Sequence, residues 1–448
     1  MATVSTAFAD TKKHYELLDG LRGVAALLVL WHHVFEGYSF AGGGPILVVN
    51  HGYLAVDFFF ILSGFVLSYA YDDRWGKSLN FGSFLKRRLI RLHPMVVMGA
   101  VLGAITFLLQ GSVQWDGTHV ATSVVMWALL ISMFMIPAVP GTPREIRGNG
   151  EMFPLNGTNW SLFFEYIGNL LYALFIRRLS TRWLRVLTIF LGVLLALFSL
   201  FDVSGYNQLG IGWTLDAVNF VGGLLRMLFP FTMGMLISRE FRENDRLSAG
   251  LDGVSRAQAS AALEGTSGSK ASASPDGHSG SQASARRTGL FRPLYVKGSF
   301  WICTAVLVVL FHIPYIEARI PLCADGTLSG SGFFAAANFG ALSLNALFEL
   351  FCIMAVFPLL VVLAASGSME GRRSQGVCNF LGDISYPLYA VHYPFMYLFY
   401  AYLIKNQVYT FGETWPLALG VCALSILVAW LSLRFYDIPL RRALSRRR

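Results

Sequence analysis

The stretch LDGLRGVAALLVLWHHVFEGY, residues 18–38, decides the fold class. It is apolar over most of its length, and it is long enough to cross a lipid bilayer, which requires about 20 such residues. It nevertheless carries Arg22, His32, His33 and Glu36 in or beside the apolar run. An ionisable group at the bilayer centre costs roughly 2.5 to 3.5 kcal/mol on insertion scales, so it is rarely kept without a role. The stretch therefore predicts a membrane helix that carries functional polar groups.

The spacing of Arg22 and His33 places them on one face of that helix. Eleven residue steps of about 100° each make three turns plus roughly 20°, so the two side chains share a stripe and their Cα atoms stand about 16 Å apart along the axis. His32 is rotated by about 80° from Arg22 and is the better candidate for a packing role. Gly23 keeps the first turns slim, which allows a neighbouring helix or a ligand to approach. We expect Arg22 and His33 to face one water-accessible tunnel.

The composition extends the membrane interpretation to the whole chain. Of 448 residues, 55% are hydrophobic and 14% are charged, and the mean hydropathy is +0.54, which is outside the ordinary soluble range. The net charge of +9 does not indicate nucleic-acid binding, because the arginines form short clusters at the ends of apolar segments, as the positive-inside rule expects. The five cysteines show no metal or disulfide spacing. We expect a polytopic all-α bundle with no metal and no permanently bound cofactor.

Eleven apolar segments qualify or nearly qualify as membrane crossings. The basic clusters at 86–91, 177–185, 239–246, 371–373 and 441–448 should lie in the cytoplasm, whereas the tract 137–158 should be extracytoplasmic. An odd number of crossings must then join residues 94 and 138, although this region contains two candidates, 94–110 and 119–138. We predict about ten crossings plus one partial or re-entrant segment, with 119–138 as the preferred partial one. Both termini are predicted to be cytoplasmic, and the first apolar helix should act as the insertion signal.

Composition also divides the chain into regions. Residues 1–240 form the N-terminal part of the transmembrane domain, and residues 291–440 form its C-terminal part. Between them, residues 241–290 are rich in Ser, Ala and Gly and are predicted to be a disordered cytoplasmic linker. Residues 441–448 are a basic cytoplasmic tail. Asn156 begins a glycosylation sequon on the predicted outer side, next to the membrane.

Several motifs, in order along the chain, resemble one family. LDGLRGVAALLVLWHH followed by HGYLAVDFFFILSGFVLSY is similar to the opening of the acyltransferase 3 family of integral-membrane acyltransferases, whose first helix carries an arginine and a histidine separated by ten residues. Further similar segments are KRRLIRLHP at 86–94, NWSLFFEYIGNLLY at 159–172, RMLFPFTMGMLI at 226–237 and DISYPLYAVHYPF at 383–395. RFYDIPLRR at 434–442 resembles the closing element of the family, with Asp437 where glutamate is usual.

The resemblance implies transfer of an acyl group, usually acetyl, from acyl-CoA on the cytoplasmic side to a hydroxyl of a sugar, lipid or small natural product. An alcohol is a weak nucleophile, and His33 is the candidate base that removes its proton. Arg22 would hold the donor or set the potential of the pocket, and Glu165 would pair with an arginine or orient the acceptor hydroxyl. We prefer a ternary complex to a covalent acyl-histidine, which stays open.

The other candidate site residues serve donor binding. Coenzyme A is strongly anionic and requires a cationic mouth, for which Arg88 and Arg91 share a helix face at i, i+3. Arg226 interrupts an apolar helix and should face a partner or a polar cavity. Tyr389 and His392 lie on one stripe and would bind a sugar or line the donor tunnel. Plain membrane anchoring and structural ion pairing remain alternatives for these residues, and Asp57 is read as structural or pocket-lining.

Other functions are compatible with ionisable groups inside membrane helices. A multi-pass transporter is the main alternative, although the sequence lacks the internal repeat that transporters often show. A scaffold without activity and an acyltransferase of another membrane family are weaker alternatives. The sequence leaves open the acceptor, the acyl chain length, the oligomeric state and the choice between plasma membrane and endomembranes.

Overall fold

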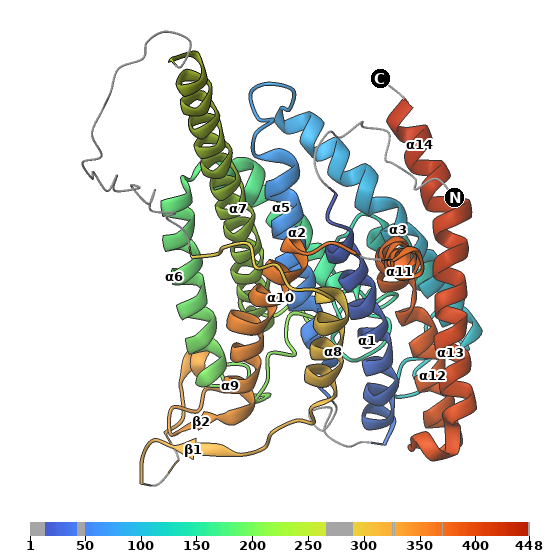
Figure 1. Ribbon diagram of the computed structural model, residues 1–448. Coiled ribbons are helices and arrows are strands. Elements are labelled where there is room, and N and C mark those ends of the chain that lie inside the picture. Colours follow the sequence, from blue (N-terminus) through green and yellow to red (C-terminus); the bar gives the residue numbers. More distant parts are fainter. Residues whose placement is uncertain are drawn as a thin grey trace.

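The computed structural model describes residues 14–42, 50–265, 290–324, 326, 328–369 and 371–446. These residues form a helical bundle with one small antiparallel sheet (Figure 1), which confirms the all-α polytopic prediction. The α-helices are α1 (Glu16–Ala41), α2 (Ala55–Tyr71), α3 (Phe81–Leu109), α4 (Thr122–Met133), α5 (Asn159–Leu174), α6 (Thr181–Leu200), α7 (Ala217–Gly265), α8 (Ser299–His312), α9 (Leu344–Phe351), α10 (Phe357–Ser366), α11 (Arg372–Val391), α12 (Tyr393–Asn406), α13 (Phe411–Leu431) and α14 (Ile438–Arg446).

Shorter elements complete the chain. They are the 3-10 turns η2 (His51–Leu54), η3 (Ile176–Arg178) and η4 (Gly332–Phe334), the π-helical turns η5 (Cys352–Val356) and η6 (Ser432–Asp437), and the strands β1 (Arg319–Pro321) and β2 (Ala341–Ser343). The strands pair Ile320 with Leu342 in the middle of the register. They lie at the opposite end of the bundle from α14 (Figure 1).

Among the described residues, seven continuous helical segments are long and apolar enough to cross a membrane: 16–41, 51–71, 81–109, 181–200, 217–244, 344–366 and 411–446. Helix α4 is a shorter apolar helix of 12 residues, which extends only about 18 Å against a hydrocarbon core of about 30 Å. This length agrees with a partial segment at 119–138. The count of ten crossings stays a prediction.

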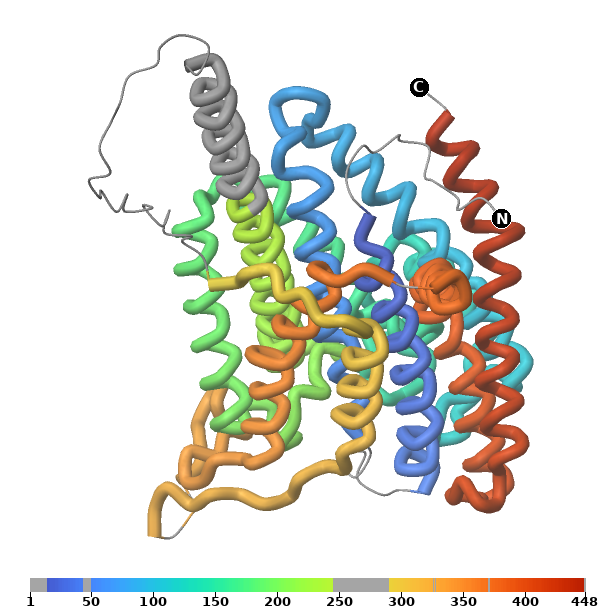
Figure 2. Tube along the Cα trace, viewed as in Figure 1, coloured from blue at the N-terminus to red at the C-terminus, as the bar shows by residue number. Residues whose placement is uncertain are grey.

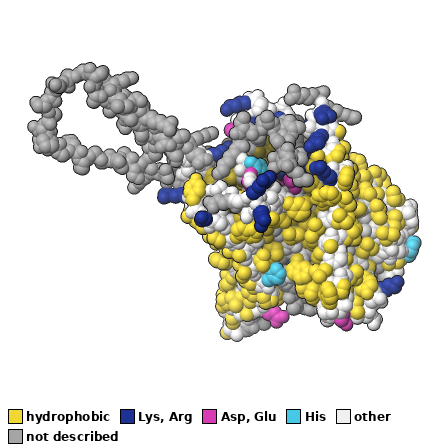
Figure 3. Space-filling view, turned by 45° about the vertical axis from the view of Figure 1, so that its right-hand side comes forward, with side chains coloured by type: hydrophobic (Ala, Val, Ile, Leu, Met, Phe, Trp, Pro, Cys, Tyr) yellow, Lys and Arg dark blue, Asp and Glu magenta, His cyan; other side chains and the backbone are white. Residues whose placement is uncertain are grey.

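Charge is distributed unevenly over the surface. In Figure 3 hydrophobic side chains cover a broad belt, and most of the visible lysines and arginines gather toward one end. This basic end, defined by the start of α3 with Lys86 and by α14 with Arg441 and Arg442, also holds the start of α1 (Figures 1 and 2). The distribution is the one expected of a protein with all these elements on a single side of a bilayer.

Helix α1 lies inside the bundle and packs closely along α11. Gly23 contacts α11 so closely that an added Cβ would lie 2.2 Å from the carbonyl oxygen of Leu381, and further along, Gly37 contacts the ring of Tyr400 on α12. Gly20 meets Cys378 and Gly23 meets Leu381 on α11, so the contacts advance in the same direction along both helices and α1 and α11 run parallel. The slim first turns expected from the sequence are therefore used by a neighbouring helix.

Helix α7 is longer than the sequence indicated. It pairs with α2, where a Cβ on Gly64 would lie 1.9 Å from the carbonyl oxygen of Phe231, and it continues to Gly265. The start of the linker, predicted at residue 241, is therefore too early, because residues 241–265 continue the helix. Alanine and other good helix formers in this stretch favour that continuation. The rest of the predicted linker, residues 266–289, lies outside the described residues.

Candidate functional site

A cavity of about 80 Å³ opens among α1, α2, α3, α5 and α11 near the basic end. Its lining brings together residues that the sequence singled out from four different helices, namely Arg22, Arg88, Arg91, Glu165 and Tyr389. Arg91 is exposed, whereas Arg88 is buried, so the cavity reaches inward from the bundle surface. Residues more than 300 positions apart in the sequence thus meet at one polar site.

Positive charge dominates the lining of this cavity. Arg88 donates from Nη2 to Oε1 of Glu165 at 2.8 Å, and Ser63 donates to the same oxygen at 2.8 Å. Arg22 donates to Oδ1 of Asp19 at 3.0 Å. Three guanidinium groups therefore face two carboxylates, and the buried Nε of Arg88 has no hydrogen-bond partner among the described residues. Such a donor set suits an anionic ligand.

Tyr389 forms the inner wall of the cavity. Its hydroxyl and that of Ser161 are 2.6 Å apart, and its ring meets Phe59 edge-on at a centroid distance of 5.2 Å. One turn further along the chain, His392 lies 6.0 Å from the Tyr389 ring. His392 in turn stacks on His33, with centroids 5.3 Å apart. Tyr389 and His392 therefore lie between the cavity and His33.

His33 belongs to a second polar cluster and is not among the residues that line the cavity. Its Nδ1 is 2.5 Å from Oε2 of Glu36, and the ring of Tyr393 packs edge-on against it at 4.6 Å. Tyr400 donates to Oε2 of Glu36 at 2.9 Å and to the His33 carbonyl oxygen at 2.7 Å. The shared tunnel expected for Arg22 and His33 is thus interrupted, because aromatic side chains from α11 and its junction with α12 fill the space between them.

Two other histidines complete this cluster. His32 Nδ1 bonds Oδ1 of Asn50 at 2.8 Å, so His32 ties α1 to the segment before η2 as a packing residue would. His392 is fully buried and bonds the carbonyl oxygen of Leu388 through Nδ1 at 2.9 Å. Its Nε2 has no hydrogen-bond partner among the described residues.

Arg226 lies elsewhere, in a buried ion pair with Asp57. Its Nη2 donates to Oδ2 of Asp57 at 2.6 Å, its Nε donates to Oδ1 at 3.1 Å, and its Nη1 donates to the carbonyl oxygen of Ile211 at 2.9 Å. The Arg226 side chain is 1% exposed, and it does not line the cavity. The structure therefore does not bring Arg226 to the other predicted donor-binding residues. Its guanidinium group instead donates hydrogen bonds to Asp57 and to the carbonyl oxygen of Ile211.

The buried polar groups of α9 continue this structural network. Tyr53 donates its hydroxyl to Glu349, and Glu349 also accepts from the backbone N–H of Leu209 at 2.8 Å. Asn345 bonds both Glu349 and Nε2 of His51. These bonds hold the loop after α6 against η2 and α9. They account for Glu349, to which the sequence assigned no role.

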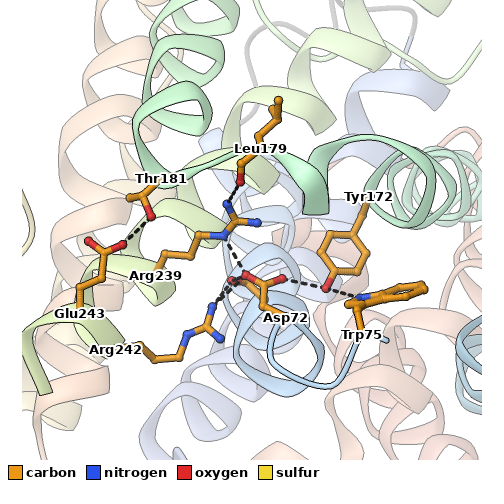
Figure 4. A network of polar contacts seen from close by, with 9 residues as sticks. Asp72, Trp75, Tyr172, Leu179, Thr181, Arg239, Arg242 and Glu243 are labelled. Atoms are coloured by element: carbon orange, nitrogen blue, oxygen red, sulfur yellow. Dashed lines mark hydrogen bonds and ion pairs between the residues drawn. The ribbon is translucent and has the colours of Figure 1, made fainter. Parts of the chain in front are cut away.

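A further ionic cluster fastens the basic end (Figure 4). Asp72, just after α2, accepts hydrogen bonds from Arg239 at 2.7 Å and Arg242 at 2.8 Å, both on α7. The hydroxyl of Tyr172 on α5 donates to the same carboxylate at 2.8 Å, and Trp75 donates to that hydroxyl at 3.0 Å. The cluster fixes α2, α5 and α7 beside the cavity, and sequence spacing gave no signal for it, since Asp72 and Arg239 are 167 positions apart.

Glu36 and Tyr400 are the site residues to which the sequence analysis assigned no role. Glu36 stands three positions after His33, the i, i+3 spacing at which helical side chains meet, and this spacing could have identified it. Tyr400 is 364 positions away from Glu36, and only the fold brings the two together.

Comparisons with known proteins identify the family. A model of the acyltransferase domain matches residues 15–434. A protein of the picA locus of Rhizobium radiobacter is 36% identical over 168 residues, which are 36% of this chain and 82% of that protein. The acyltransferase MdmB of Streptomyces mycarofaciens is 29% identical over 170 residues, 36% of this chain and 38% of its own length.

A third relative is the peptidoglycan O-acetyltransferase OatA of Listeria monocytogenes, which is 33% identical over 94 residues, 20% of this chain and 14% of its own length. No solved structure matches. The family model covers nearly the whole chain, including every helix that lines the cavity. The protein therefore belongs to the family of membrane proteins that share this acyltransferase domain.

Proposed function

We propose that this membrane acyltransferase moves an acyl group from acyl-CoA to a hydroxyl of a carbohydrate, a lipid or a small natural product, with His33 as the general base. The observation that carries the proposal is the meeting of Arg22, Arg88 and Arg91 in one cavity, on the same side of the bundle as the other basic clusters. That side would face the cytoplasm, where acyl-CoA is found.

The arginines would hold the anionic phosphates of the donor. Guanidinium groups bind phosphate through paired N–H donors, and the buried Nε of Arg88 offers a donor that no described residue uses. The cavity of about 80 Å³ is far too small for a whole coenzyme, so only part of the donor fits unless the site opens. Glu165, which bridges Arg88 and Ser63, would hold the cationic wall in place.

The distance from the cavity to His33 fits a long, linear donor. Arg22 and His33 are about 16 Å apart along α1, so an anionic group at Arg22 and a reactive carbonyl at His33 must lie at the two ends of one extended molecule. A pantetheine thioester has that form. Its arm would pass Tyr389, whose hydrogen bond to Ser161 must open for the purpose.

The proposed reaction is balanced without an added metal or oxidant. The acceptor oxygen attacks the thioester carbonyl, and its proton passes to the free ring nitrogen of His33. The carbon–sulfur bond then breaks, and the departing thiolate takes the proton back from the imidazolium. A serine or cysteine nucleophile is not needed for this route.

The acceptor is the open part of the proposal. One relative is a peptidoglycan O-acetyltransferase by name, which is compatible with a carbohydrate acceptor here. We therefore place hydroxyl-bearing carbohydrates first, followed by lipids and natural products.

Loss of the gene tests the proposal and identifies the acceptor. Comparative mass spectrometry of cells with and without the protein should reveal molecules that are lighter by one acyl unit in its absence. The wild-type protein should restore the missing mass, and the H33A variant should restore it at least about a hundredfold less well. H312A is the matched control, because His312 lies at the exposed end of α8. Equal restoration by H33A and wild type would reject His33 as the base.

A further inference from the structure

Glu36 is the hydrogen-bond partner of His33, the proposed base. Glu36 lies one turn after His33 on α1, and its Oε2 is 2.5 Å from Nδ1 of His33. Both side chains are largely enclosed, at 13% and 19% exposure. A carboxylate at hydrogen-bond distance accepts a hydrogen bond from Nδ1–H, so that the proton stays on Nδ1 and Nε2 carries the lone pair.

Tyr400 holds Glu36 in this position from another helix. Its hydroxyl lies 2.9 Å from Oε2 of Glu36 and 2.7 Å from the carbonyl oxygen of His33. Its ring occupies the space left by Gly37, where an added Cβ would be 2.5 Å away. Tyr400 can therefore rest against α1 only because residue 37 has no side chain.

Two rings restrict the other movements of the His33 imidazole. His392 stacks on it with an interplanar angle of 29°, and Tyr393 meets it edge-on. A ring held by a carboxylate at one nitrogen and by aromatic groups on its face and edge has one tautomer and one orientation. General-base catalysis depends on that orientation, because the proton moves only between aligned atoms.

A metal site is the alternative explanation of the same cluster. One ligand atom from each of His32, His33 and Glu36 lies within 4.8 Å of the others. Around tetrahedral zinc, however, Zn–N bonds of about 2.1 Å keep neighbouring ligand atoms roughly 3.4 Å apart. The 2.5 Å between Nδ1 of His33 and Oε2 of Glu36 is instead a hydrogen-bond length.

We propose that Glu36, fixed by Tyr400, is the positioning residue that sets the tautomer and the orientation of His33. The inference rests on the proposed function of His33 as the base. It assigns to Glu36 the orienting role that a carboxylate plays beside a catalytic imidazole, here built from two residues of one helix and locked by a tyrosine from α12.

The kinetic test uses the full-length protein in detergent or nanodiscs with acetyl-CoA and the identified acceptor. E36Q should lower kcat about ten- to a hundredfold with little change in the donor KM, because a general base contributes about 10²- to 10⁴-fold in total. E36D should recover part of the loss. Y400F should have a smaller effect, and E36Q/Y400F should be no slower than E36Q, since Tyr400 acts through Glu36. E413Q, at an exposed position on α13, is the matched control.

A second measurement needs no activity. Diethyl pyrocarbonate modifies neutral imidazoles, and peptide mass spectrometry can follow His33, with His312 as an internal reference. At about pH 8, where an ordinary imidazole is neutral, loss of the carboxylate that accepts from Nδ1–H makes Nε2 a weaker nucleophile and frees the ring to turn. E36Q should therefore slow the modification of His33 at least severalfold relative to His312 and relative to wild type.

The outcomes separate this inference from the function on which it rests. If H33A stays active, the proposed function fails. If H33A is inactive while E36Q keeps wild-type kcat and wild-type His33 reactivity, only the role of Glu36 is overturned. Strictly additive effects of E36Q and Y400F would also overturn it. A chelator that abolishes wild-type activity, followed by recovery on addition of Zn²⁺, would also overturn the role of Glu36, because Glu36 would then be a metal ligand.

Discussion

Removal of Arg226 should destabilise the protein without weakening donor binding. The two partners of the Arg226–Asp57 pair are 1% and 0% exposed, and two hydrogen bonds of 2.6 and 3.1 Å join them. Breaking a buried ion pair on one side costs about 3 to 5 kcal/mol, because the remaining charge stays buried without a partner. At about 2 °C per kcal/mol, the lower end for domains of 150–250 residues, R226M should unfold about 6 to 10 °C earlier than wild type.

Thermal unfolding in detergent, followed by intrinsic fluorescence, gives the midpoint, and equilibrium binding gives the affinity for acetyl-CoA. The double variant D57N/R226M should be less destabilised than the sum of the single variants, because it leaves no unpaired charge. R182M, at an exposed position on α6, should change stability by no more than about 0.5 kcal/mol. An unchanged midpoint in R226M together with weaker acetyl-CoA binding would show that Arg226 binds the donor and does not stabilise the fold.

Three further predictions concern the loop between α4 and α5 and the wall of the cavity. Burial raises the pKa of Glu151 to about 7, against the opposing effects of Arg147 and Tyr397. The native protein therefore binds more protons than the unfolded chain between about pH 4.5 and 7. As the pH rises through this range, the contribution of Glu151 to the free energy of unfolding, about 3 kcal/mol, is lost. The unfolding midpoints at pH 5 and pH 8 should therefore differ less in E151Q than in wild type. Asn156 is 1% exposed and donates to the carbonyl oxygen of Ala390 at 2.8 Å, so peptide mass spectrometry should find its sequon unglycosylated. Y389F should bind acetyl-CoA up to about fivefold more tightly in equilibrium binding. The hydrogen bond between Tyr389 and Ser161, worth about 1 kcal/mol, would no longer oppose the opening of the passage for the donor. Equal or weaker binding would contradict this.

The sequence predicted well what depends on one helix at a time. Hydropathy was sufficient for the all-helical membrane fold, and the motifs were sufficient for the family. The short α4 lies inside 119–138, the segment that the charges of the flanking loops, and not its own length, marked as partial. Arg88 and Glu165, both named from the sequence, line one cavity and form an ion pair, whereas their role in donor binding stays a prediction.

Contacts between segments far apart in the chain could not be predicted from the spacing of residues in the sequence. Arg226 was expected to face a partner or a polar cavity, but its local sequence could not show that Asp57, 169 positions away, is that partner. The interruption between Arg22 and His33 comes from Tyr389 and His392, which α11 brings alongside α1. The extension of α7 was missed for another reason, because a high content of Ser, Ala and Gly was interpreted as disorder although residues 241–265 also contain many helix formers.

In the mechanism proposed here, the arginine cavity and His33 bind the two ends of one donor molecule. A structure determined with a non-hydrolysable thioether analogue of acetyl-CoA tests it most directly. We expect phosphate oxygens within hydrogen-bond distance of Arg88 or Arg91, a displaced Tyr389, and the carbonyl carbon of the analogue beside the imidazole of His33. Phosphates bound away from these arginines, or a carbonyl group that does not reach His33, would contradict it.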